Sequence, residues 1–452
     1  MARLRPFDTS TPEGRSKERY RRIALTTASS MGARGIGVLV SLATVPLALS
    51  YLGKQQFGLY ATITSLLAWV TVLNFGIVNG LVNAISQAHG KDDRQAAGSY
   101  ASTAFFTLVV ISALLGLVFA LAAPFVPWSD VLAVRGLLDE GVVMWSVIAA
   151  VGAVLVGMPL SITPQMYAGY QRMYVANLFL VLGSLLTLIG VYVAVRLEVS
   201  LPVLILVFGG AAPVVTLCNL IFVSRYQMPW LRPRISQFSR AAVRRLMTTS
   251  VPLFLFQLAA LLVNQTDLVV LAHRTDLGTV AEYAIILRVY GLLVTVIALG
   301  TYSFIPSFRE SYERGDHGWM RASFRRLLYL RMALAVVGTL IMMAAGNWLL
   351  RIWLGQEAVS FGLEIWAAFA VVILAVTWVT TFSELLIIMD RIWSQVVLAT
   401  INGIAVVLLT YWLAPTLGIL GAVLALGFVT TVAWTWLLPL MVRPVLESER
   451  VT

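Results

Sequence analysis

Charged residues are scarce in this 452-residue chain: they make up 12% of it, against about 25% in a typical soluble domain. Hydrophobic residues make up 59%, and a chain this apolar would expose large hydrophobic patches if it folded in water. In a lipid bilayer the same surface is covered by lipid, while each α-helix satisfies its own backbone hydrogen bonds. The composition therefore excludes a soluble globular protein and predicts an all-α polytopic membrane protein.

Residue types that build catalytic and metal sites are also rare. Cys218 is the only cysteine, so the chain can form no intrachain disulfide. The three histidines, His89, His273 and His317, have no metal-ligand spacing, and the glycine-rich GARGIG at 32–37 follows no strand and is therefore not a nucleotide loop. We expect no metal, no cofactor and no catalytic site. The polar, basic first 22 residues also give no sign of a cleavable signal peptide.

Long apolar segments follow one another along the whole chain, and a membrane-spanning helix needs about 20 such residues. Twelve segments meet this requirement, at 23–50, 57–85, 99–123, 141–163, 175–195, 201–223, 246–272, 280–305, 327–350, 362–389, 394–413 and 418–442. They predict an N-lobe of six helices (23–223) and a C-lobe of six helices (246–442), joined by a basic linker (224–245). A basic N-terminus (1–22) and a short tail (443–452) complete the expected organisation.

The distribution of lysine and arginine predicts how the chain is oriented in the membrane. Of the 32 basic residues, 25 fall on the side that carries both termini, with Arg331 counted in the basic loop before the ninth segment, and 5 fall on the other side. Because basic loops stay in the cytoplasm, both termini are expected to be cytoplasmic in a bacterial inner membrane. The net charge of +11 is spread over these loops rather than gathered on one folded domain. We therefore expect no nucleic-acid partner.

The segment 318–331, GWMRASFRRLLYLR, interleaves four arginines with apolar residues. One interpretation is an amphipathic helix that lies in the headgroup layer and contacts anionic lipid. The other is that these arginines only fix the topology.

Two hairpins in the sequence look alike. Residues 51–66, YLGKQQFGLYATITSL, join the first two predicted spans, and residues 275–289, TDLGTVAEYAIILRV, join the seventh and eighth. Each contains Leu-Gly, a short polar linker and then Tyr-Ala at the start of an apolar helix, so that Tyr60 aligns with Tyr283. A match spaced six helices apart indicates a duplicated six-helix unit with parallel topology, which is common among transporters.

The same residues carry a resemblance to a known family. The first hairpin with LNFGI at 73–77, and Asp267 followed by Leu-Gly at 277–278, Tyr-Ala at 283–284 and Arg288, resemble the polysaccharide transporter family. This family comprises the O-antigen and exopolysaccharide flippases of the multidrug/oligosaccharidyl-lipid/polysaccharide exporter (MOP) superfamily. The resemblance implies two six-helix lobes around a central cavity that opens alternately to each side. The implied cargo is an undecaprenyl-pyrophosphate-linked oligosaccharide, flipped to the outer leaflet for cell-surface polysaccharide biosynthesis. Membrane lipids and polysaccharide biosynthesis proteins are the other expected partners.

Arg34 lies in the middle of the first predicted span, between small residues that let another backbone or a ligand approach closely. Charges at this depth usually face a cavity or a partner. We expect Arg34 to bind the pyrophosphate of the cargo, because a guanidinium pairs with phosphate in a bidentate way. The alternative is that Arg34 snorkels or donates to the carbonyls of a neighbouring helix.

Asp267 and Arg288 lie at similar predicted depths in the seventh and eighth spans. One hypothesis is an ion pair between these helices, because a lone carboxylate in the membrane would be costly. The other is that Arg288 lines the cavity and binds substrate, while Asp267 is a proton or sodium coupling site.

Asn74, Asn79 and Asn83 are three amides in the second predicted span, and the last two share one helical face. Amides that face a cavity suit sugar hydroxyls, so we expect these residues to contact substrate. Hydrogen bonds between helices are the competing interpretation.

Two other functions are compatible with a chain of this kind. A membrane polysaccharide polymerase or ligase would need a large outer loop with catalytic groups, and the longest outer loop here, 124–140, is short. A cation-coupled drug exporter of the same superfamily would share the fold but would favour acidic cavity residues. The arginines within the spans favour an anionic cargo, and we expect a transporter rather than an enzyme.

Overall fold

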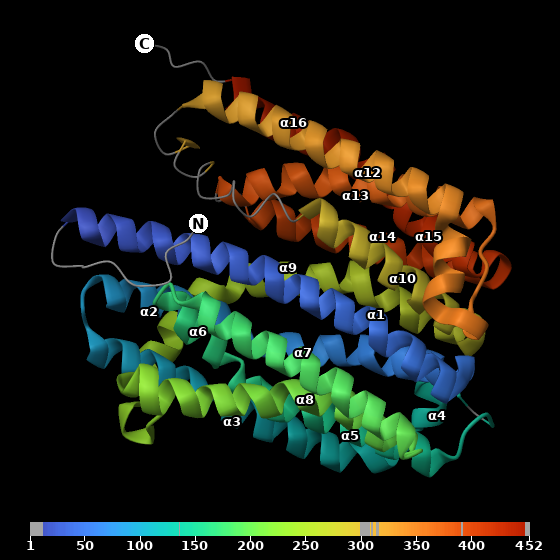
Figure 1. The fold of residues 1–452 in the computed structure, drawn as a ribbon, viewed down its shortest axis with the longest axis horizontal. Helices are drawn as coiled ribbons and strands as arrows, with labels where there is room; N and C mark the ends of the chain where they lie inside the picture. Colours follow the sequence, from blue (N-terminus) through green and yellow to red (C-terminus); the bar gives the residue numbers. More distant parts are fainter. Residues whose placement is uncertain are drawn as a thin grey trace. The chain divides into compact units, whose positions relative to one another are not determined.

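The structure is a computed structural model that describes residues 12–134, 136–298, 308, 311–312, 316–389 and 392–447. Residues 1–11 and 448–452, and the end of the predicted span 280–305, lie outside the described residues. Within the described part of the chain every regular element is a helix, which confirms the predicted all-α polytopic fold (Figure 1). The helices are α1 (Pro12–Val72), α2 (Ile77–Gly90), α3 (Arg94–Ala122), α4 (Trp128–Val131), α5 (Glu140–Leu160), α6 (Ile162–Gly169), α7 (Met173–Arg196), α8 (Leu201–Phe222), α9 (Arg240–Arg274), α10 (Leu277–Ala298), α12 (His317–Leu354), α13 (Leu363–Ile388), α14 (Ile392–Leu417), α15 (Ile419–Val429) and α16 (Thr435–Glu447).

Among the described residues, 11 helical segments are long and apolar enough to cross a membrane. The first of them, Leu25–Val72, has 48 residues and would be about 72 Å long if straight, more than twice the thickness of a bilayer core. It bends at Gly53, whose φ of 67° and ψ of 173° are not helical and are conformations that glycine adopts readily. The first segment therefore contains the first predicted span and the beginning of the second, residues 57–72, and the bend falls in the predicted hairpin.

The second predicted span, 57–85, is not one continuous helix: α1 ends at Val72 and α2 begins at Ile77. Asn74 causes this break. Its side-chain Nδ2 donates to the carbonyl oxygen of Thr71 at 2.9 Å, and its Oδ1 accepts from the backbone N–H of Gly76 at 2.8 Å. Such local bonds compete with the helical ladder, and Phe75 and Gly76 then adopt left-handed φ values of 53° and 71°.

The described residues group into two compact units. The first unit comprises the parts up to residue 51, 69–131 and 135–254, and the second unit comprises 52–68, 132–134 and the part from 255 onward. Residues 52–68, called here the 52–68 segment, thus pack with the second unit although the predicted N-lobe contains them. The lobe boundaries taken from helix counting stay a prediction.

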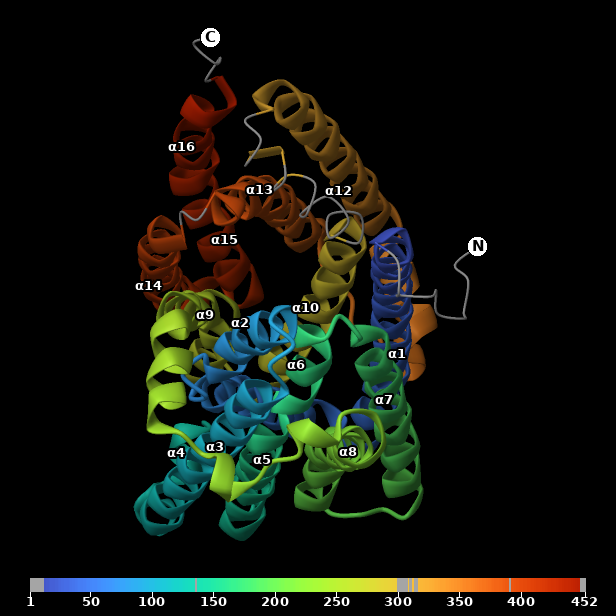
Figure 2. The ribbon, with the colours of Figure 1, turned by 90° about the vertical axis from the view of Figure 1, so that its left-hand side faces the viewer.

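In the first unit, α8 packs against α5 and α7, while α3 packs against α2 and α5 (Figure 2). The core of this unit lies between α2, α3, α6 and the chain that follows α8. Tyr167 of α6 is fully buried there, and its hydroxyl donates to Oδ1 of Asn219 at 2.9 Å. A buried phenol with a partner costs little, so this contact ties α6 to α8 inside the core.

The predicted basic linker 224–245 is packed against α3 rather than extended. After a π-helical turn (Val223–Gln227) come two short 3₁₀ turns (Pro229–Leu231 and Ile235–Gln237). Ser99 Oγ donates to the carbonyl oxygen of Gln237 at 2.9 Å, and Ser102 Oγ accepts from the backbone N–H of Arg234 at 3.1 Å. These bonds give the linker a fixed position on the first unit.

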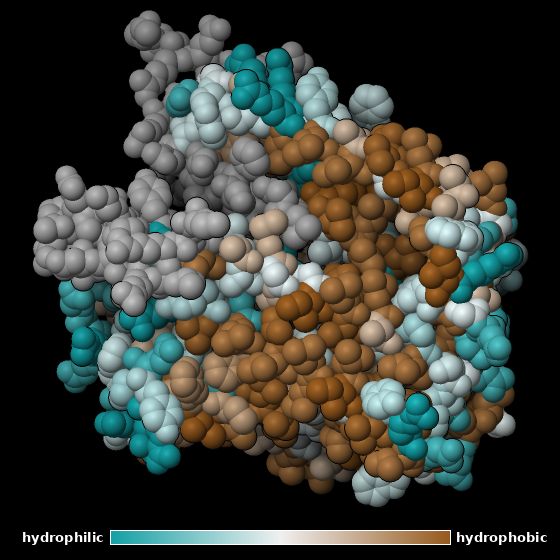
Figure 3. Space-filling view, viewed as in Figure 1, coloured by the Kyte–Doolittle hydropathy of each residue, from teal (hydrophilic) through white to brown (hydrophobic). Residues whose placement is uncertain are grey.

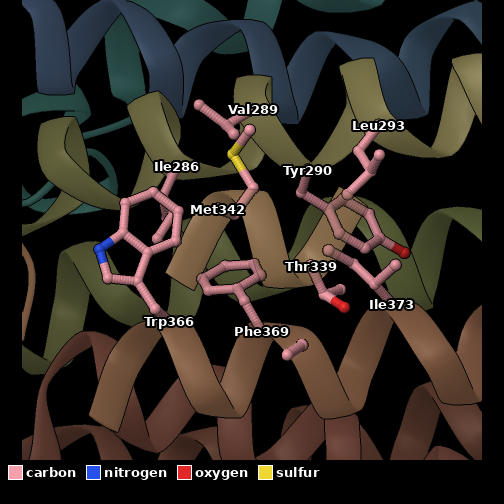
Figure 4. A pocket seen from close by; sticks show the side chains of 10 residues that line it. Ile286, Val289, Tyr290, Leu293, Thr339, Met342, Trp366, Phe369 and Ile373 are labelled. Atoms are coloured by element: carbon pink, nitrogen blue, oxygen red, sulfur yellow. The ribbon is translucent and has the colours of Figure 1, made fainter. Parts of the chain in front are cut away.

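In the second unit, α13 packs against α12, α15 and α16. Figure 4 shows Trp366 and Phe369 of α13 facing side chains of α10 and α12 across a small pocket. The pocket measures about 10 Å³, which is at most room for one water molecule. Its lining is apolar apart from Thr339 and the Tyr290 hydroxyl, so we interpret it as a packing gap in this unit.

Arg331 is buried in α12, which corrects its assignment to a basic loop. Only 3% of Arg331 is exposed, and its Nη1 lies 2.9 Å from Oε2 of Glu384 in α13. The segment 318–331 forms the first turns of the continuous helix α12 rather than a separate helix in the headgroup layer. The helix begins here because Asp316 caps it: its Oδ1 accepts from the backbone N–H of Trp319 at 3.0 Å.

Gly346 marks a close approach between α12 and α13, and it gives the first prediction. A Cβ atom at Gly346 would lie 2.6 Å from the Trp366 ring, too close without movement of an indole that is 4% exposed. Gly346→Ala is expected to lower the free energy of unfolding by about 1–3 kcal/mol, the usual cost of overpacking. Denaturant unfolding of the purified protein in detergent measures this. Gly291→Ala is the control, because nothing lies within 4 Å of a Cβ there; equal effects of both changes would contradict the prediction.

Apolar side chains cover the outward faces of the helices, as Figure 3 shows for one side of the molecule. Large side chains such as Leu121 (65% exposed) and Trp436 (75% exposed) lie on these faces. In water this surface would be unstable, and in a bilayer it is in contact with lipid. The protein is therefore a multi-pass membrane protein.

Candidate functional site

A cavity of about 350 Å³ lies within the second unit. Its walls come from the 52–68 segment, α9 and α10, with one side chain from α15. The polar residues that line it are Tyr60, Thr64, Gln265, Asp267, Arg288 and Tyr290. Both hairpins of the predicted repeat therefore contribute to one cavity, and it brings together a carboxyl group, a guanidinium group and several hydroxyl and amide groups.

The two hairpins are in direct contact beside this cavity. The backbone at Gly58 approaches α10 so closely that a Cβ atom there would lie 2.1 Å from the carbonyl oxygen of Leu277. Ser65 Oγ donates to the carbonyl oxygen of Gln265 in α9, and Lys54 Nζ lies 3.0 Å from Oε1 of Glu282. Only glycine permits this approach at residue 58, which explains its place in the hairpin motif.

Asp267 is a buried carboxyl group in the wall of the cavity, with 3% of its surface exposed. Its Oδ2 accepts a hydrogen bond from the hydroxyl of Tyr283, which is itself fully buried. Its Oδ1 accepts from the backbone N–H of Leu268 at 2.9 Å. Asp267 thus has neutral donors as its partners, and a group placed in this way can take up or release a proton or cation.

Arg288 is the basic group of the same cavity. It lies about 18 Å along α10 from the turn at Asp276, near the middle of a bilayer core about 30 Å thick. The residue is exposed in the structure and lines the cavity. A guanidinium at this depth is costly unless a partner or water is present, so the geometry favours an anionic ligand in the cavity.

The predicted ion pair between Asp267 and Arg288 is not formed. Both residues are described, and the structure contains no hydrogen bond or ion pair between them. Tyr283 takes the place of the arginine as partner of the carboxyl group, because it faces Asp267 from α10. The other hypothesis, in which Arg288 lines a cavity beside Asp267, agrees with the geometry, while its role in binding stays a prediction.

Arg34 belongs to the first unit and is exposed on α1. A Cβ at the flanking positions Gly32 and Gly35 would have no neighbouring atom within 4 Å, whereas Ala33 between them is buried. One turn earlier, the buried amide of Asn177 in α7 donates to Ser29 Oγ at 2.9 Å and to Ser30 Oγ at 2.8 Å. These bonds fix α1 against α7, and the binding role of Arg34 stays a prediction.

The three asparagines differ in their surroundings. The nitrogen and the oxygen of the Asn74 side-chain amide both form hydrogen bonds with nearby backbone at the helix break. These contacts stabilise the break in the helix. Asn79 is half-buried and Asn83 is exposed, on the same face of α2. A role for the three side chains in substrate binding stays a prediction.

Tyr60, Tyr283 and Tyr290 are cavity or near-cavity residues that were not proposed as functional from the sequence. Tyr60 and Tyr290 line the cavity, and the hydroxyl of Tyr283 donates a hydrogen bond to Asp267, which also lines it. The alignment of Tyr60 with Tyr283 in the repeat was the sequence signal that could have identified these two tyrosines. Aromatic residues with one polar atom suit a site that must bind both apolar and polar parts of a ligand.

Comparisons with known proteins agree with this architecture. An inward-facing multidrug resistance MATE family transporter of the MOP superfamily superposes with a TM-score of 0.76 at 13% identity, covering 90% of this chain and 95% of that chain. A MOP superfamily transporter from Pyrococcus furiosus, reported to have a binding pocket of reversed polarity, gives a TM-score of 0.69 at 13% identity, covering 95% and 97%. The chain therefore has the fold of the MOP superfamily transporters.

The family within this superfamily follows from the sequence. The family described as "Polysaccharide biosynthesis protein" matches residues 24–312, and the chain belongs to it. A Salmonella typhi protein described as "Putative O-antigen transporter" is 23% identical over 436 residues, covering 92% of this chain and 95% of its own length. A Salmonella typhimurium protein (strain LT2) of the same description is 24% identical over 265 residues, covering 56% and 57%. These findings confirm the predicted family.

Proposed function

We propose that this protein is a flippase that moves an undecaprenyl-pyrophosphate-linked oligosaccharide across the bacterial inner membrane by alternating access, for cell-surface polysaccharide biosynthesis. The observation that carries the proposal is the cavity with Arg288 in a chain of the polysaccharide biosynthesis family. The description of the Salmonella relatives as O-antigen transporters supports a glycan cargo. With both termini in the cytoplasm, as the distribution of basic residues predicts, the cavity would extend from the outer hairpins to about the middle of the membrane.

The chemistry of the cavity suits such a cargo. A pyrophosphate carries negative charge and acceptor oxygens, which a guanidinium binds through parallel N–H donors. The amide of Gln265 and the hydroxyls of Tyr60 and Thr64 can exchange hydrogen bonds with sugars. Apolar side chains such as Phe57 and Leu287 line the rest of the cavity.

A second candidate function is cation-coupled export of an amphipathic drug. The fold favours it, because multidrug transporters have TM-scores of 0.76 and 0.68 against this chain. The buried Asp267 would then serve a cationic substrate or a coupling ion. The two functions differ in the sign of the cargo's charge, and an arginine that lines the cavity favours the anionic one.

Inactivation of the gene in its own cells tests the main proposal. Without the flippase, lipid-linked oligosaccharide should accumulate in the inner leaflet and surface polysaccharide should be lost, while glycan synthesis on the lipid carrier continues. Labelling of spheroplasts with a lectin specific for the glycan measures the outer-leaflet pool. Unchanged surface polysaccharide together with increased drug sensitivity would instead establish the exporter.

Asp267 gives a prediction about energy coupling. Asp267→Asn keeps the size of the side chain and an acceptor for Tyr283 but removes the group that can carry a proton. We expect transport into proteoliposomes to lose its dependence on an imposed proton gradient, with normal amounts of folded protein. Tyr283→Phe, which removes the hydrogen bond and keeps the carboxyl group, should retain that dependence. A gradient response of Asp267→Asn equal to wild type would show that Asp267 is only structural.

A further inference from the structure

A separate cavity of about 150 Å³ lies at one end of the first unit. Three connections between helices form it: the end of α2 with the start of α3, the turn between α6 and α7, and the chain that follows α8. The residues that line it are His89, Asp92, Arg94, Tyr170, Arg172, Met228 and Trp230. Neither the family match nor the proposed transport path assigns a role to this cavity.

The position of this cavity along the helices places it at a membrane surface. Candidate spans begin at Arg94 and Met173 and end at Gly169 and Gln227, and all four ends adjoin the cavity. The ends of apolar spans meet the lipid headgroups, where tryptophan, tyrosine and arginine are commonly found. The distribution of basic residues predicts that this end faces the cytoplasm.

Aromatic contacts hold the walls of the cavity in place. Trp230 Nε1 donates to the Tyr170 hydroxyl at 2.8 Å, and the His89 ring centroid lies 4.4 Å from that of Tyr170. The guanidinium carbon of Arg94 lies 4.5 Å from the centroid of the Trp230 ring, within the range of a cation–π contact. Arg94 is therefore oriented before any ligand arrives.

Two donors in the cavity have capacity for a ligand. Tyr170 is 7% exposed, and its oxygen accepts from Trp230, but the described residues provide no acceptor for its own hydroxyl hydrogen. Burial raises the pKa of Tyr170, so this hydroxyl stays protonated and can donate. Arg172 is half-buried, and its guanidinium forms no hydrogen bond or ion pair with other described residues. The Tyr170 hydroxyl hydrogen and the Arg172 guanidinium are therefore the donors that a polar ligand in this cavity can use.

The charge and size of the cavity restrict the class of ligand. Arg94 and Arg172 against Asp92 leave one net positive charge when His89 is neutral, which matches a phosphodiester. About 10–15 Å³ of this kind of volume is enough for one water molecule, so a cavity of about 150 Å³ has room for a phosphate group. Basic pockets between the cytoplasmic ends of membrane helices are known binding sites for anionic lipid headgroups.

We propose that this cavity binds the phosphodiester group of an anionic phospholipid in the adjacent leaflet, with Arg172 and Arg94 as the charged donors and Tyr170 as the neutral one. The phosphate of the lipid lies beside the linker 224–245, whose Met228 and Trp230 form one wall of the cavity. A water-soluble phosphate ester has the same recognised group. A lipid is favoured because the cavity lies at the ends of four apolar spans.

Native mass spectrometry of the full-length purified protein tests this site. The protein is exchanged into phosphatidylcholine and titrated with synthetic phosphatidylglycerol. Phosphatidylcholine has the same phosphodiester, but its quaternary ammonium group is repelled by the two arginines of the cavity. Neither preparation contains polyprenyl lipids, so cargo cannot occupy the site. We expect wild type to retain phosphatidylglycerol, and Arg172→Gln to bind it about tenfold or more weakly, the effect of losing a charge-assisted hydrogen bond. Arg232→Gln is the matched control, an exposed arginine of the same linker that does not line the cavity.

Each outcome decides for or against the site. Equal retention of the two lipids by wild type, or unchanged binding by Arg172→Gln, overturns the proposal. Binding of glycerophosphoglycerol, the water-soluble phosphodiester without acyl chains, as tightly as phosphatidylglycerol would also overturn it in favour of a soluble ligand. If Arg172→Gln does not fold, Arg172→Lys replaces it: the charge is kept and the planar fork is lost, so an intermediate affinity is expected. An affinity of Arg172→Lys equal to wild type counts against the site.

Discussion

Replacement of Arg288 with alanine is expected to reduce glycan export by about 10- to 150-fold at limiting cargo, because a charge-assisted hydrogen bond to phosphate contributes about 1.5–3 kcal/mol. Arg288 lines the cavity of the second unit at mid-membrane depth and has no ion-pair partner among the described residues. Its loss removes the basic group that the cavity offers to a pyrophosphate. Translocation of a fluorescent lipid-linked oligosaccharide in proteoliposomes measures the effect.

Two further variants separate binding from simple loss of charge. Arg288→Lys keeps the charge without the planar fork, so its export rate should lie between those of wild type and Arg288→Ala. Arg351→Ala removes an exposed arginine of the same unit that lies at the end of α12 and outside the cavity, and it should export at the wild-type rate. Wild-type export by Arg288→Ala at normal protein levels would exclude Arg288 from cargo binding.

Much of the fold could be predicted because bilayer thickness and hydropathy act on each helix separately. The bend at Gly53 fell at a predicted hairpin, and α3, α7 and α13 correspond to single predicted spans. The break after Val72 was not predicted, because hydropathy continues across it and only the side-chain bonds of Asn74 interrupt the helix. A local hydrogen-bond pattern of this kind leaves no mark in a hydropathy profile.

Asp267 and Arg288 are the two residues of the cavity that were proposed from the sequence, and the ion pair between them is not formed. Depth along a helix can be counted from the turn at Asp276: Asp267 lies about 13 Å away, Tyr283 about 10 Å and Arg288 about 18 Å. Tyr283 and Arg288 also differ by about 140° around the axis of α10. Tyr283, which is closer in depth to Asp267, is therefore its partner, while Arg288 lines the cavity. The direction in which a helix faces depends on packing, which one sequence does not specify.

The buried pair of Arg331 and Glu384 gives the prediction with the largest effect on stability. Arg331 Nη1 lies 2.9 Å from Oε2 of Glu384, and its Nη2 lies 3.4 Å from Oγ1 of Thr380. The Glu384→Leu variant leaves the buried guanidinium of Arg331 without its counter-charge. Loss of one partner of a buried pair costs about 3–5 kcal/mol. Because the Glu384 side chain is 33% exposed, we expect a loss near the lower end, about 3 kcal/mol.

Denaturant unfolding in detergent measures this loss, and two comparisons identify its cause. The double variant Arg331→Met with Glu384→Leu removes both charges and should recover most of the stability, since a well-packed apolar pair often replaces a buried ion pair without loss. Glu282→Leu breaks the exposed pair with Lys54, where the side chains are 30% and 44% exposed, and should cost less than about 1 kcal/mol. If Glu384→Leu costs no more than Glu282→Leu, water reaches Arg331 and the pair does not hold α12 against α13. A double variant no more stable than Glu384→Leu would instead mean that packing, rather than an uncompensated charge, causes the loss.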